Sequence, residues 1–191
     1  MRRRGAWWAA LMIVAGSVMT ACGDDGSSTG GGGDPAAAEQ RLEEQRDAVR
    51  ELALQVAPAL ADSVSGTLTF LRGSWAGCTS ADQWTYRNFK YRVAGRIDAT
   101  GLSADSLTTL QGVLRDEGFE VSTPEADGEP GADGVRKELA AGLRIYPDDS
   151  FALVSFAGSC VDVPEGDREA WGSRSEPDKN LVPPAASSPA E

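Results

Sequence analysis

The spacing of apolar residues predicts an amphipathic helix over residues 35–60. Asp34 and Pro35 suit the N-cap and the first helical position, and Pro58 is a point at which the helix could bend. Such a helix packs either on its own domain or on a partner as a coiled-coil stub. The first is favoured, because a sustained coiled coil needs more heptads than this segment has. The apolar side comprises Leu42, Val49, Leu52, Ala53, Val56 and Leu60, and the charged side Glu43, Glu44, Arg46, Asp47 and Arg50.

A period of two follows the helix and predicts β-structure. Residues 67–71 form a short strand candidate, and residues 73–78 are typical of a turn that carries a buried Trp75 beside Cys78. Residues 86–97 alternate clearly, which predicts a half-buried strand with a basic outer face. One side comprises Phe89, Tyr91, Val93 and Ile97, and the other Asn88, Lys90, Arg92 and Arg96. The three basic residues of the outer side either bind an anion or form a solvated face that balances nearby acids.

The strongest local signals predict a second helix that begins after Ser103 and ends near Gly118. Ser103 suits the N-cap, and Leu102 can pack on Leu107 as a hydrophobic staple. Gly118 stands where a left-handed residue ends a helix, and the segment 119–121 then begins a strand. The buried stripe of this helix comprises Leu107, Leu110, Val113 and Leu114.

The acidic residues of the segment 124–134 raise the question of a metal site. Asp127, Glu129 and Asp133 alternate with other residues, as calcium ligands can. However, the spacing does not match the EF-hand loop, which has Gly at its sixth position and Glu at its twelfth. We therefore expect a polar loop here and no metal site.

A β-hairpin is expected from residues 135–145 and 151–157, joined by a turn at 147–150. One parity of the first strand is apolar, with Val135, Leu139, Ala141, Leu143 and Ile145. The second strand is apolar on both parities, which is typical of a central strand. The part 135–141 could instead be helical. Residues 164–191 are polar and rich in proline, and we expect a disordered tail that docks locally through Trp171.

The first 21 residues have the layout of a secretory signal: Arg2-Arg3-Arg4, an apolar stretch and small residues up to Ala21. The stretch is shorter than the roughly 20 apolar residues of a membrane-spanning helix. Val18-Met19-Thr20-Ala21-Cys22 resembles a bacterial lipobox, in which the cysteine is lipidated and becomes the N-terminus. Residues 22–34 are a flexible Gly/Ser tether, which leaves one domain at 35–163. The alternatives are ordinary secretion and an uncleaved signal anchor.

Composition excludes several functions. The formal net charge is −11, and removing the three arginines of the signal makes the mature chain −14, which disfavours binding to nucleic acid. The absence of histidine excludes the usual Ser-His-Asp and Cys-His catalysis and removes the commonest zinc ligand. We therefore expect no catalytic residues, no cofactor and no metal. The preference for Arg over Lys, with abundant Ala and Gly, suggests a GC-rich genome.

Three cysteines are present, and lipidation of Cys22 leaves Cys78 and Cys160. An even remainder outside the cytoplasm indicates one disulfide, the alternative being two free thiols.

Several short motifs resemble those of small, largely uncharacterised envelope lipoproteins of actinobacteria. They are Gly73-Ser74-Trp75 with Cys78, Gly118-Phe119-Glu120-Val121, Gly142-Leu143-Arg144-Ile145, and Phe156 with Ser159-Cys160-Val161. The resemblance implies the disulfide Cys78–Cys160 and an envelope location, and it supplies no catalytic residues. The predicted fold is α+β: an antiparallel sheet of about four to five strands, with two helices packed on one face and Arg92 and Arg96 on the other.

The leading hypothesis for function is a non-catalytic lipoprotein, anchored at the outer side of the cell membrane, that binds a protein or a cell-wall component. The first alternative is a carrier of a small apolar or lipidic ligand in a pocket between sheet and helices. The second is an enzyme, which would need paired carboxylates such as Asp148 and Asp149 or a Ser–Lys pair. The sequence does not indicate the oligomeric state.

Overall fold

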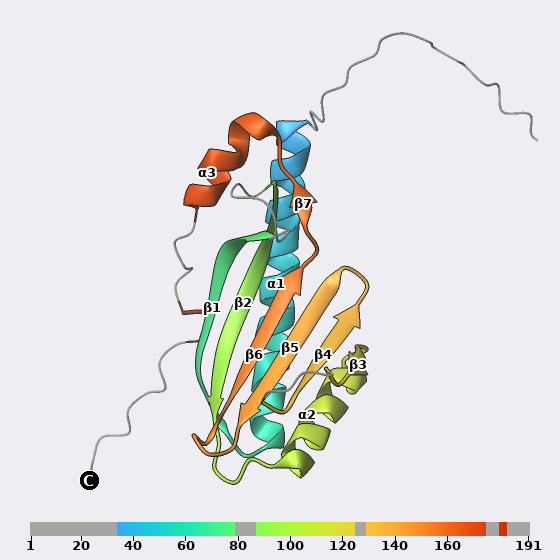
Figure 1. The fold of residues 1–191 in the computed structure, drawn as a ribbon, viewed down its shortest axis with the longest axis vertical. Coiled ribbons are helices and arrows are strands. Elements are labelled where there is room, and N and C mark those ends of the chain that lie inside the picture. The colour runs from blue at the N-terminus through green and yellow to red at the C-terminus, as the bar shows by residue number, and fades with distance from the viewer. Residues whose placement is uncertain (1–33, 79–86, 125–128, 175–179, 183–191) are drawn as a thin grey trace, which may run out of the picture. The chain divides into compact units, whose positions relative to one another are not determined.

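The computed structural model describes residues 34–78, 87–124, 129–174 and 180–182. These residues form an α+β fold with an antiparallel sheet, as predicted, although the sheet has seven strands and not four or five. Its order is β1-β2-β6-β5-β4-β3, and β7 pairs with β2 beyond the end of β6 (Figure 1). The strands are β1 (Thr67–Cys78), β2 (Asn88–Asp98), β3 (Glu120–Ser122), β4 (Gly131–Arg136), β5 (Leu139–Tyr146), β6 (Phe151–Gly158) and β7 (Val161–Asp162).

The long helix α1 (Pro35–Ser63) packs on the sheet of its own domain, which settles the alternative left open by the sequence. Asp34 caps it, since the Asp34 Oδ1 atom accepts a hydrogen bond from the Ala36 amide at 3.1 Å. The helix continues through Pro58 to Ser63, three residues further than predicted. Every member of the predicted apolar side is buried: Leu42, Val49, Leu52, Ala53, Val56 and Leu60.

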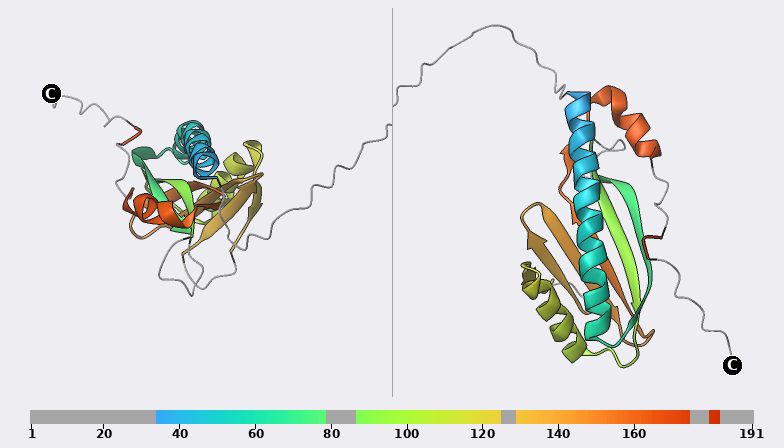
Figure 2. Two further views of the ribbon diagram at one scale, coloured as in Figure 1. Left: turned by 90° about the horizontal axis from the view of Figure 1, so that it is seen from above. Right: turned by 180° about the vertical axis from the view of Figure 1, so that it is seen from behind.

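Helix α2 (Ala104–Asp116) begins and ends as its sequence predicts. Ser103 and Ser106 form a capping box. At the other end Gly118 has a φ of +84°, and the Phe119 amide donates to the Leu114 carbonyl at 3.0 Å. Both α1 and α2 lie on the same face of the sheet, as Figure 2 shows, and neither lies on the opposite face, which is called the helix-free face below.

Strand β1 is longer than the sequence suggested. The expected turn at 73–78 is wrong, because the strand runs unbroken from Thr67 to Cys78 and each residue of 73–78 has a partner in β2. Gly73 and Gly77 favour a turn locally, but the tertiary pairing overrides that preference. Trp75 is half-buried, and it packs edge-on against Tyr91 with 5.0 Å between the ring centroids.

The segment 129–146 also differs from expectation. Strand β4 begins at Gly131, inside the segment predicted to be a loop, and residues 125–128 of that loop lie outside the described residues. The predicted strand 135–145 is two strands that meet at Lys137, which has a φ of +55°. Because the turn changes the parity, Val135 is 56% exposed and not buried, whereas Ala141, Leu143 and Ile145 are buried as predicted.

The ordered chain continues past residue 163, where the sequence analysis placed a disordered tail. A short 3₁₀ turn, η1 (Glu165–Asp167), leads into α3 (Arg168–Ser173). Trp171 of α3 is 5% exposed and packs edge-on against Trp75, with centroids 4.9 Å apart. The contact therefore involves a folded helix, which one large aromatic residue holds against the end of the sheet. This second small core comprises Leu42, Phe89, Val161, Val163 and Trp171.

Candidate functional site

The helix-free face of the sheet carries the basic row predicted from the sequence. Figure 1 looks onto this face, with α1 behind it. The strand register places Arg92 between Ser74 of β1 and Ala157 of β6. Arg96 pairs with Leu153 of β6, which in turn lies beside Arg144 of β5. The structure thus brings the predicted residues to one side, together with two arginines, Arg72 and Arg144, that were not singled out before. The apolar side of the same strand is buried as predicted.

Two cations of this face have carboxylate partners. Arg96 donates to Asp98 at 2.6 Å, and its guanidinium stacks 4.0 Å over the ring of Phe151. Arg144 holds Asp133 with two hydrogen bonds, at 3.0 and 3.3 Å. Asp133 therefore serves as an ion-pair partner on β4, not as part of an acidic loop.

Three other cations of this face have no carboxylate partner among the residues that the structure describes. Arg92 makes a long hydrogen bond of 3.4 Å to the Ser74 hydroxyl. Arg72 lies 5.7 Å from the centroid of the Phe70 ring, and both arginines are exposed. Lys90, on the same side of β2, is partly exposed and forms no ion pair with the described part of the chain. Cations without carboxylate partners among the described residues give this part of the face a local positive charge, on a chain whose net charge is −11.

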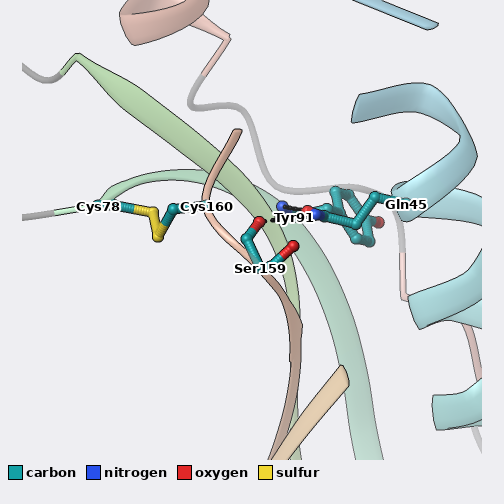
Figure 3. Close-up of a disulfide and its surroundings, with 5 residues drawn as sticks. All are labelled: Gln45, Cys78, Tyr91, Ser159 and Cys160. Carbon is teal, nitrogen blue, oxygen red and sulfur yellow. Dashed lines mark hydrogen bonds between the residues drawn. A yellow bond between two sulfur atoms is a disulfide. The ribbon is translucent and has the colours of Figure 1, made fainter. Parts of the chain in front are cut away.

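A second feature lies at the break between β6 and β7. β2 pairs with β6 as far as Arg92 and with β7 from Phe89, so the sheet opens beside Tyr91. Gln45 of α1 fills the opening: its Oε1 atom accepts from the Tyr91 amide at 2.8 Å, and its Nε2 atom donates to the Ser159 carbonyl at 2.7 Å (Figure 3). Sequence analysis missed this role, because Gln45 stands among charged residues on the helix and no local pattern marks it.

The disulfide lies at the same break. Cys78, the last residue of β1, is bonded to Cys160, which lies between β6 and β7, and their Cα atoms are 6.2 Å apart (Figure 3). The pairing confirms the prediction. It ties the edge strand to the point where the sheet is interrupted, while Gln45 ties the same point to α1.

An open groove of about 950 Å³ runs beside this junction, between α1, the β4–β5 turn and the β6–β7 segment. Its walls carry three cations, Arg41, Arg136 and Lys137, and three carboxylates, Glu44, Glu138 and Asp162. Such a lining does not suit an apolar or lipidic ligand. The groove therefore gives no support to the carrier hypothesis.

The other residues singled out from the sequence do not form a site. Asp148 and Asp149 are exposed in the turn between β5 and β6. Within the described parts of the chain, no three His, Cys, Asp or Glu side chains are grouped so as to hold a metal ion. The search for membrane-spanning helices covered the same parts, and none of their helices is both long and apolar enough to cross a bilayer. Cys22, the signal and most of the tether lie outside the described residues.

Comparisons with known proteins add little. No family model and no curated protein matches the chain. The chain is similar to a solved structure, that of LppA from Mycobacterium tuberculosis, described as a candidate lipoprotein. The two are 15% identical, with a TM-score of 0.38, and the match covers 67% of this chain and 88% of LppA. A likeness at this level leaves the function of the chain open.

Proposed function

We propose that the chain is a lipid-anchored protein on the outer side of the cell membrane, and that it binds a partner in the envelope without catalysing a reaction. The anchor is proposed from the lipobox, in which Cys22 would carry the lipid, and from the Gly/Ser composition that follows it. The disulfide Cys78–Cys160 supports the location, because structural disulfides persist mainly in oxidising compartments.

The observation that carries the binding role is the helix-free sheet face. Arg72, Lys90 and Arg92 lie on it without carboxylate partners among the described residues, although the chain as a whole is acidic. A group of surface cations on an acidic protein favours binding to a partner that presents anionic groups. The absence of histidine from the sequence supports a non-catalytic role.

Membrane fractionation of the producing bacterium tests the anchor. The protein is expected in the membrane fraction, and Cys22→Ala should move it to the soluble extracytoplasmic fraction. The double variant Cys78→Ala/Cys160→Ala is the matched control: it removes two cysteines but keeps the lipidation site, so any folded protein should remain membrane-bound. Retention of Cys22→Ala in the membrane after a high-salt wash would refute the anchor.

A further inference from the structure

Strand β6 is apolar on both of its faces, although the helices cover only one. Ala152, Val154 and Phe156 are buried against α1, as expected for the helix side. On the opposite side lie Phe151 and Leu153, and Leu153 is 38% exposed. The solvated face of an antiparallel sheet normally presents polar residues, so apolar side chains there mark a surface that is covered at some time.

Neighbouring strands extend this apolar strip. Phe70 of β1 shares a row with Arg96 and Leu153, and Tyr146 of β5 stacks on Phe151 with 4.6 Å between the ring centroids. Beside them, Ala94, Gly142 and Ser155 form a row of small residues. The centre of the face therefore carries short side chains beside partly apolar ones.

The cations border this strip. Arg72 and Arg92 stand on the β1–β2 side and Arg144 on the β5 side. On β1 and β2 the face carries Arg72, Lys90, Arg92 and Arg96 against one carboxylate, that of Asp98. The local excess is positive, and it opposes the sign of the whole chain. A partner that covers the β1–β2 part of this face is expected to supply carboxylates or other anionic groups there, whereas Asp133, Glu120 and Asp162 supply carboxylates at the other strands of the same face.

The combination of features selects the class of partner. A phosphate polymer or a lipid headgroup layer needs cations alone, whereas arginines around an exposed leucine and partly exposed aromatic side chains are typical of protein–protein interfaces. We propose that the helix-free face is the docking surface for an acidic protein of the envelope, one that places an apolar side chain on Leu153 and carboxylates against Arg72 and Arg92. This inference rests on the proposed function for the location of the partner, but not for the chemistry of the face.

The spacing along β2 defines a probe. Alternate residues of a strand project to one face about 7 Å apart, so Lys90 and Arg92 match carboxylates on alternate residues of an extended peptide. A fluorescent peptide of the pattern Glu-Ser-Glu-Ser-Leu-Ser-Leu, in which Ser separates the other residues, carries both features and is called the Glu/Leu peptide. The same peptide with Gln in place of Glu is the uncharged probe. Soluble polyphosphate and phosphatidylglycerol vesicles represent the other anionic classes.

Fluorescence anisotropy with the full-length protein in detergent tests the proposal. The Glu/Leu peptide should bind saturably, and more weakly at higher salt. Arg72→Glu/Arg92→Glu should weaken binding at least tenfold, and Leu153→Ser should weaken it several-fold. The control Arg41→Glu/Arg115→Glu makes the same change of charge at exposed helix positions, and it should stay within about twofold of the wild type.

Photo-cross-linking tests the same face in a protein that keeps all of its arginines and lysines. A photoreactive residue at the exposed Ser155 should capture the Glu/Leu peptide, and one at the exposed Thr108 of α2 should not. Absence of peptide binding, binding that the Arg72/Arg92 variant leaves unchanged, or binding of polyphosphate or vesicles alone would overturn the proposal. The two proposals can fail separately. Failure of the lipid anchor would be seen in the membrane fractionation, and unlipidated protein can still be tested for binding of the Glu/Leu peptide.

Discussion

Gln45 is predicted to contribute to stability far more than its position on a polar stretch of helix suggests. Its amide bridges the Tyr91 amide of β2 and the Ser159 carbonyl at 2.8 and 2.7 Å, where the sheet is interrupted. Gln45→Ala removes both bonds and leaves a backbone donor and a backbone acceptor without these partners.

The magnitude follows from the two bonds. Each hydrogen bond in a folded protein contributes about 0.5–1.5 kcal/mol net, so the loss is about 1–3 kcal/mol. Alanine is the better helix former by a few tenths of a kcal/mol, which slightly reduces that loss. Gln40→Ala on the same helix is the matched control, because within the described residues the Gln40 side chain bonds to Glu44 one turn away and to no other element. That exposed pair contributes about 0.2–0.5 kcal/mol, which the gain in helix propensity offsets.

Equilibrium unfolding in urea measures both variants, and their difference isolates the bridge from helix propensity. Gly158→Ala provides a second approach, since a Cβ atom at Gly158 would overlap the Gln45 side chain and displace its amide. In a double-mutant cycle, the loss of unfolding free energy caused by Gly158→Ala should be smaller by at least about 1 kcal/mol when residue 45 has already been changed by Gln45→Ala. Equal stability of the Gln45→Ala and Gln40→Ala variants, or additive effects in the cycle, would refute the bridging role.

Three further predictions concern the same end of the domain and the edge of the sheet. Cys78→Ser/Cys160→Ser opens a loop of 82 residues and should lower the free energy of unfolding by about 4–5 kcal/mol on the loop-entropy model; an unchanged urea midpoint would contradict this. Trp171→Ala removes the side chain that joins α3 to Trp75 and Phe89, and it should lower the free energy of unfolding by about 3 kcal/mol. Hydrogen exchange in α3 should be faster in this variant than in the Trp171→Phe control, and equal exchange in both would contradict the role of Trp171 in holding α3. Truncation after Arg174 removes Asn180 and Leu181, which bond to the amide and the carbonyl of Leu71 on the edge strand β1 at 2.9 and 2.8 Å. Because an uncovered edge strand can pair with another chain, the truncated protein should self-associate with rising concentration in size-exclusion chromatography. A truncated protein that stays monomeric would contradict this role of the segment.

Local signals in the sequence predicted those elements whose ends and faces depend on neighbouring residues. The caps of α2 at Ser103 and Gly118 are examples, since each acts through backbone groups within a few positions. The alternation around Tyr91 is another, because one buried face imposes a period of two on the strand whatever its partners are.

Elements that depend on tertiary pairing were not predictable in the same way. The strand Gly131–Arg136 has two glycines and an aspartate in its first four residues, so its composition favours a loop. It is a strand because β5 pairs with it on one side and β3 on the other. Trp171 offered a usable signal, a lone large aromatic in a polar segment, but its partner Trp75 lies far away in the sequence.

The candidate site was predictable in part. Alternation placed Lys90, Arg92 and Arg96 on an outer face, but Arg72 required the true length of β1, and Arg144 required the register of β5. The two-sided apolar pattern of residues 151–157 was correctly interpreted as that of a central strand. That one of these two apolar sides lies on a face without α1 or α2 could not be predicted, because it depends on where both helices pack.

The intact mass of the protein from the membrane fraction, before and after reduction and alkylation, tests the central proposal most directly. The account predicts a chain that begins at Cys22 and carries the added mass of acyl chains. It should accept no alkylating groups before reduction and two after it, at Cys78 and Cys160. A chain without acyl mass would contradict the membrane anchor, and one that also retains Arg2-Arg3-Arg4 and has free thiols would contradict the extracytoplasmic location as well.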